Sequence, residues 1–110
     1  MKDSKTIFLS WDFGLRGDFQ GLFTWLDRQE AKECGNNLAV FSFKFDSGDF
    51  LDELEIQLKN EVKFEKRDRV YAIWREAEAD KLKGKFLFGS RKTAPWEGFA
   101  ARVTETVDGE

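Results

Sequence analysis

Few side chains in this chain could do chemistry, because the sequence contains no histidine and a single cysteine. The lack of histidine excludes Ser-His-Asp and Cys-His catalysis, imidazole bases and histidine metal sites. Carboxylates, lysine, tyrosine, one thiol and a hard cation held by oxygen ligands remain. The glycines also form no phosphate-binding loop pattern. Any reaction must therefore depend on this short list of groups.

Asp12 and Cys34 are the two single residues that stand out. Asp12 ends an apolar run just before Gly14, where its carboxylate can accept backbone hydrogen bonds at the turn or act in catalysis. Cys34 has Lys32 as its only cationic neighbour. A reactive thiol needs surroundings that stabilise the thiolate, so the sequence favours a small, half-buried, packed cysteine.

Charge is unevenly distributed along the chain, although the net charge is only −3. Residues 46–61 contain six acids and one lysine, whereas residues 81–102 contain six basic residues and one acid. The basic segment holds four candidate contacts for a partner or a nucleic acid: Arg91, Lys92, Trp96 and Phe99. The rings could stack on bases, the segment could meet the acidic helix of a second subunit, or both charged faces could simply be solvated. The negative net charge favours self-association over binding to phosphate polymers.

The spacing of apolar residues predicts the elements that position these side chains. Two-residue alternation predicts strands over residues 6–13, 38–45 and 69–74, with a short strand at 31–34 and a last one at 85–88. Asp18 is expected to cap a helix that ends near residues 28–30 and buries Phe19, Leu22, Phe23 and Leu26, with Trp25 beside them. A second helix follows the break at residues 46–49 and buries Leu51, Leu54, Leu58 and Val62. Residues 76–83 are predicted to be a loop.

This order of elements predicts an α+β fold, a ferredoxin-like two-layer sandwich with a mostly antiparallel sheet and two helices on one face. Residues 1–110 then form a single domain, with 89–110 an irregular C-terminal segment. The other sheet face must meet water, a partner or that segment. Because disordered tails rarely carry large aromatic residues, we expect Trp96 and Phe99 to be buried, over this face or across a dimer interface.

Three short motifs carry a resemblance to known proteins. They are the Ser-Trp-Asp at residues 10–12, the small-residue segment at 31–34 that leads into the aromatic strand, and the Asp-Arg-Val at residues 68–70. In these places, over roughly residues 6–75, the chain resembles a ferredoxin-like superfamily. Its members include the small CRISPR-associated spacer-acquisition nuclease and virulence-associated protein D.

The resemblance implies a role for Asp12 as a metal ligand. In those nucleases the aspartate that ends the first strand comes from both subunits of a homodimer and is implicated in holding a divalent metal. Asp12 is the matching position. Two such carboxylates could bind Mg²⁺, and the metal could activate a water molecule against a phosphodiester. Only Arg16 offers a positive charge close by in the sequence, and one cation is few for holding a phosphate group.

The sequence predicts a cytoplasmic location, because the single cysteine cannot form an internal disulfide and no secretory leader is visible. No apolar run approaches the roughly 18 residues that suggest a membrane span. The first hypothesis is a non-enzymatic homodimer, without a cofactor, that associates through its sheet face and C-terminal segment. The alternatives are a Mg²⁺-dependent nuclease on RNA or DNA that uses Asp12 from two subunits, and a nucleic-acid-binding module that uses the basic C-terminal segment.

Overall fold

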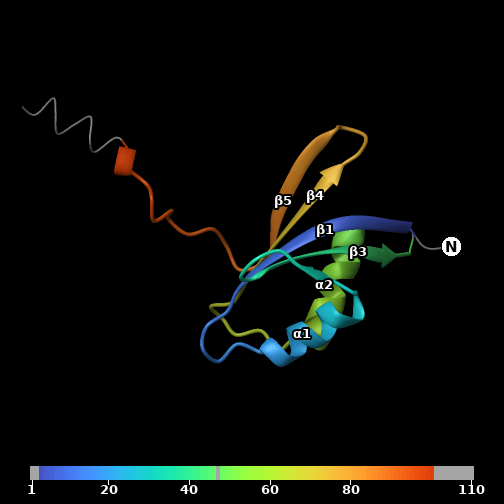
Figure 1. Cartoon of the computed structure of the whole chain (residues 1–110), viewed down its shortest axis with the longest axis horizontal. Helices are drawn as coiled ribbons and strands as arrows, with labels where there is room; N and C mark the ends of the chain where they lie inside the picture. Colours follow the sequence, from blue (N-terminus) through green and yellow to red (C-terminus); the bar gives the residue numbers. More distant parts are fainter. Residues whose placement is uncertain (1–2, 47, 101–110) are drawn as a thin grey trace, which may run out of the picture.

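The computed structural model describes residues 3–46 and 48–100, and it confirms the predicted two-layer α+β sandwich (Figure 1). The elements are β1 (Asp3–Asp12), α1 (Phe19–Arg28), β2 (Lys32–Glu33), β3 (Leu38–Phe45), α2 (Phe50–Glu61), β4 (Arg69–Glu76) and β5 (Lys81–Phe88). The strands form one antiparallel sheet in the order β2-β3-β1-β4-β5. The connections from β1 to β4 are those of a ferredoxin-like sandwich, and β5 extends the sheet by one strand.

Both helices cover the same face of the sheet, and the hydrophobic core lies between the two layers (Figure 1). Alternate strand residues point into this core, among them Ile7, Leu9, Trp11, Ala39, Phe41, Phe43, Val70, Ala72 and Trp74. The rings of Trp25, Phe41 and Phe43 have centroids 5.2 to 6.5 Å apart. No helix of the described residues covers the opposite sheet face, which we call the open face.

An aspartate caps the N-terminus of each helix, as the sequence predicts for Asp18. Asp18 accepts the N–H of Gly21 at 2.9 Å, and Asp49 accepts the N–H of Leu51 at 3.0 Å. The second oxygen of Asp18 accepts the N–H of Lys63, just after α2, at 2.9 Å. One carboxylate therefore joins the start of α1 to the end of α2. Within the described ranges, no helix is both long and apolar enough to cross a membrane.

The structure corrects three details of the prediction. Strand β5 begins at Lys81, so the predicted loop shrinks to residues 77–80. Its first half projects past the helices and stays exposed, so its lysines do not alternate with buried apolar residues (Figure 1). Phe19 and Phe23, predicted to be buried, are 36% and 52% exposed, and the buried residues of α1 are Leu22, Trp25 and Leu26. Cys34 is exposed rather than half-buried, because it follows a two-residue strand at the edge of the sheet.

From Gly89 the chain leaves the sheet and runs away from it (Figure 1). Trp96 and Phe99 are 73% and 62% exposed, so the prediction that they cover the open face is wrong. Hydrogen bonds from Glu97 N–H to Ala94 O and from Phe99 N–H to Trp96 O close two local turns in this outlying segment. Their burial across a dimer interface stays a prediction. Residues 101–110 of the predicted irregular segment lie outside the described residues.

Candidate functional site

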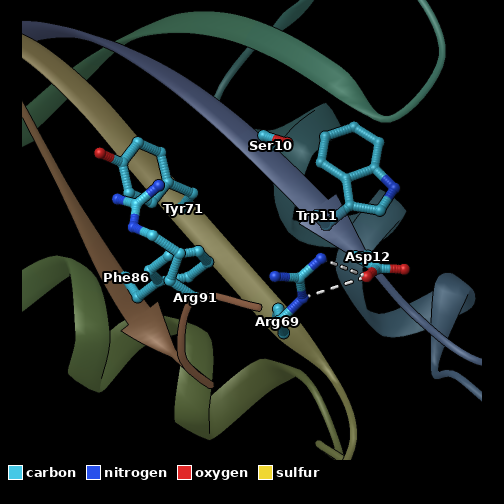
Figure 2. A pocket seen from close by; sticks show the side chains of 7 residues that line it. All are labelled: Ser10, Trp11, Asp12, Arg69, Tyr71, Phe86 and Arg91. Atoms are coloured by element: carbon cyan, nitrogen blue, oxygen red, sulfur yellow. Dashed lines mark hydrogen bonds and ion pairs between the residues drawn. The ribbon is translucent and has the colours of Figure 1, made fainter. Parts of the chain in front are cut away.

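A shallow hollow lies on the open face where β1, β4 and β5 run side by side (Figure 2). The register pairs Ser10 with Tyr71 and Asp12 with Arg69 across β1 and β4. These side chains point away from the helices because they alternate with the buried residues of their strands. The hollow has a volume of about 270 Å³ and is lined by Ser10, Trp11, Asp12, Arg69, Tyr71, Phe86 and Arg91.

Asp12 and Arg69 form an ion pair at one side of this hollow (Figure 2). The Nε and Nη2 atoms of Arg69 both donate to Oδ2 of Asp12, at 3.1 and 2.8 Å. The Nζ of Lys92 lies 3.9 Å from the same oxygen. The hydrogen bond from Arg69 lowers the pKa of Asp12, and the charge of Lys92 lowers it further. Asp12 is therefore an ionised carboxylate in cationic surroundings.

Aromatic rings form the other side of the hollow (Figure 2). Tyr71 and Phe86 pack edge-on with their centroids 4.7 Å apart. The guanidinium carbon of Arg91 lies 5.7 Å from the Tyr71 centroid and 5.4 Å from that of Phe86, within the range of cation–π attraction. Gly84 makes room for this arrangement, because a Cβ atom there would lie 2.4 Å from the Tyr71 hydroxyl.

A third ring continues the aromatic surface onto β1. Phe8 is 39% exposed and lies directly between Val40 on β3 and Ile73 on β4. Tyr71 is the diagonal neighbour of Phe8 on β4, and such neighbours lie about 7 to 8 Å apart. Partly exposed rings on three adjacent strands therefore lie on the same side of the sheet.

The two layers of the molecule carry opposite charge. Strand alternation and the contacts above place six cations on the open face: Lys32, Lys44, Arg69, Arg75, Arg91 and Lys92. Among the described strand residues Asp12 is the carboxylate of this face, while Asp80 pairs with Arg75 at the β4–β5 turn. The two helices and their N-caps carry seven acids against Arg28 and Lys59: Asp18, Asp27, Asp49, Asp52, Glu53, Glu55 and Glu61. The net charge of −3 therefore conceals a basic face and an acidic one.

The structure brings together three of the five residues that the sequence offers as catalytic, metal-binding or partner-contact residues. Asp12, Arg91 and Lys92 meet at the hollow, whereas Trp96 and Phe99 lie away from it on the C-terminal segment. Sequence reasoning missed Arg69, Tyr71 and Phe86. The alternation of β4 could have indicated an outward-facing Tyr71, but only the strand register shows that Phe86 lies beside it.

Metal binding by Asp12 stays a prediction. In the part of the chain that the structure describes, no three acidic or thiol side chains form a group that could hold a metal ion. The Asp12 carboxylate already accepts two hydrogen bonds from Arg69, and Mg²⁺ would have to compete with that guanidinium. No family model, no curated protein and no solved structure matches this chain.

Proposed function

We propose that the open face binds single-stranded nucleic acid. The observation that carries this proposal is that partly exposed aromatic rings and cations share one helix-free sheet face. Proteins bind the unpaired bases of single strands by stacking them on aromatic rings, while a basic surface attracts the phosphates. Tyr71, Phe86 and Phe8 supply the rings, and the surrounding arginines and lysines supply the charge.

The negative net charge of the chain does not oppose this binding. Seven of the acids lie in the helix layer, on the far side of the core. At physiological ionic strength, exposed charges are screened over about 8 Å. A strand on the open face would therefore respond mainly to the six nearby cations rather than to the acids of the helices.

A two-fold homodimer through the open face has less support. Its symmetry would place the same patch of each subunit against the other, so six cations would oppose six cations. Association through the C-terminal segment is the second candidate function, because Trp96 and Phe99 are exposed there and the basic segment complements the acidic helices. Light scattering on the whole protein tests it: a dimer that Trp96→Ala dissociates supports it, and a monomer at high concentration contradicts it.

Binding of short, fluorescently labelled single-stranded RNA and DNA, followed by anisotropy, tests the nucleic-acid proposal. Tyr71→Leu and Phe86→Leu are each expected to weaken binding about tenfold, since stacking on one ring contributes roughly 1 to 3 kcal/mol per base. Phe23→Leu is the matched control, because Phe23 is 52% exposed on α1 in the helix layer. Circular dichroism establishes that each variant is folded.

Two results would contradict the proposal. The wild-type protein could bind neither RNA nor DNA at low salt, or Phe23→Leu could weaken binding as much as Tyr71→Leu. The second result would place the binding surface outside the open face.

A further inference from the structure

The hollow on the open face contains hydrogen-bonding groups that the ion pair leaves unused. Oδ2 of Asp12 accepts hydrogen bonds from Nε and Nη2 of Arg69, whereas Oδ1 accepts no hydrogen bond from any described residue. The Asp12 side chain is 46% exposed, so this oxygen is open to a ligand. The hydroxyl of Ser10, on the same face of β1, likewise has no partner among the described residues.

The free oxygen of Asp12 and the hydroxyl of Ser10 lie beside the aromatic rings of Tyr71 and Phe86. Ser10 is the direct cross-strand neighbour of Tyr71, and Asp12 is the next residue along the same face of β1. Figure 2 shows Tyr71, Phe86 and Arg91 at one side of the hollow and the Asp12–Arg69 pair at the other. The Arg91 guanidinium lies 5.7 Å from the Tyr71 centroid. A flat ring that displaces this guanidinium and stacks against Tyr71 can direct its polar edge toward Asp12.

We propose that this hollow reads one base of the bound strand and prefers guanine. The inference rests on the proposed function. Guanine presents two adjacent N–H donors, N1–H and the exocyclic amine, which suit the free carboxylate oxygen. Its neighbouring O6 is an acceptor. In Arg69, Nε and Nη2 donate to Asp12 and Nη1 donates to the carbonyl oxygen of Ser90, so the second hydrogens of Nη1 and Nη2 are left to donate to O6. Asp12 as acceptor and Arg69 as donor thus match the order of donors and acceptor along the Watson–Crick edge of guanine.

The other bases fit this pair of groups less well. Uracil and thymine flank their single N–H with two carbonyl oxygens, which the carboxylate repels. Adenine and cytosine offer an amine next to an unprotonated ring nitrogen, so the carboxylate gains one donor and meets one acceptor. The hydrogen bond from Arg69 lowers the pKa of Asp12 below the ordinary value for aspartate, so the carboxylate is charged at neutral pH, as an ordinary aspartate is.

The test compares strands that differ at one base. A uracil-rich RNA and a thymine-rich DNA each carry a single central guanine, and matched strands carry inosine, which lacks the exocyclic amine, or adenine. We expect wild-type protein to bind the guanine strands about fivefold to tenfold more tightly than the inosine strands. This ratio lies at the lower end of the discrimination that a well-placed contact to a base edge gives. Because the comparison is made on the wild-type protein, it does not depend on a variant that folds.

Two variants then assign the preference to Asp12. Asp12→Asn is expected to bind guanine and inosine strands with equal affinity. Asp80→Asn is the matched control, because Asp80 is also an exposed carboxylate paired with an arginine, but it lies at the β4–β5 turn. It should keep the preference.

The outcomes separate this inference from the function on which it rests. Equal affinity of wild-type protein for all strands overturns the guanine preference and leaves the proposed function standing. A preference that persists in Asp12→Asn overturns the role of Asp12. Failure to bind any strand overturns the proposed function itself, and the base preference with it.

Discussion

The Asp12–Arg69 pair joins the two central strands where the hollow begins. Its partners lie directly opposite each other in the register of β1 and β4, and both hydrogen bonds reach one carboxylate oxygen. The side chains are 46% and 24% exposed, so the pair contributes little to folding stability. Its main effect is to fix a charged carboxylate beside a guanidinium, and this arrangement supplies the proposed base contact.

The titration of Asp12 tests this arrangement. Because its folded-state pKa is lowered by Arg69, the pair stabilises the fold above the unfolded-state pKa of about 3.9. That contribution disappears as the pH falls through the lower folded-state pKa. We expect the Asp12 carboxyl carbon, followed by NMR, to titrate below 3.8, the ordinary value for aspartate.

In the Arg69→Met variant the same carbon should titrate at a higher pH, since the first cause of the shift is removed. The small stability difference between wild type and Asp12→Asn should shrink over the same acidic range. A wild-type Asp12 that titrates at or above the ordinary value would show that the pair does not form in solution.

At the scale of elements, the helix layer is held in place by a carboxylate as well as by the core. Asp18 caps α1 through Gly21 and also accepts the backbone N–H of Lys63 beyond α2. Those two hydrogen bonds, with that to Lys63 the larger, lower the pKa of Asp18. Gly21 permits this contact, since a Cβ atom there would lie 2.4 Å from Asp18 Oδ2 and 2.6 Å from the carbonyl oxygen of Glu61.

The two N-caps make a matched pair for measuring this link. Asp49→Ala is expected to cost about 1 kcal/mol in the free energy of unfolding, the usual effect of losing an N-cap. Asp18→Ala should lower the stability more, because it removes the cap of α1 and the tie to α2 together. Urea denaturation of both variants measures the difference. Equal losses would mean that the bond to Lys63 contributes nothing.

The elements differ in how far the sequence predicts them. Strand β3 has the predicted bounds because Phe41, Phe43 and Phe45 alternate with polar or smaller residues over its whole length. Strand β5 was predicted four residues too short, because a strand that projects past the helices has no reason to alternate. The irregular register between Val70 and Tyr71, which decides what lies beside Tyr71, has no local signal at all.

The residues of the candidate site could also be predicted only in part, because the site depends on contacts between distant strands. Asp12, Arg91 and Lys92 could be named from charge and position, but their neighbours depend on which strands pair. Arg69 was known only as part of a short motif, and its contact with Asp12 is 57 residues distant in sequence. The outlying position of Trp96 could not be predicted either, because large aromatic residues normally indicate burial.

At the scale of the whole molecule, the separation of charge between the two layers is the property that matters most. A basic sheet face and an acidic helix layer give the protein a preferred orientation toward any polyanion. The acidic layer also discourages a strand from wrapping around the helices. Binding should therefore be confined to the open face and should weaken as salt is raised.

The proposed function requires that the open face, and not the helix layer, binds the nucleic acid strand. Amide spectra of isotope-labelled protein, titrated with a short guanine-containing single strand at low salt, test it most directly. We expect the largest shifts on β1, β4, β5 and the first residues after Phe88, including Ser10, Tyr71 and Arg91. Shifts concentrated on α1 and α2, or an unchanged spectrum at saturating strand concentration, would contradict it.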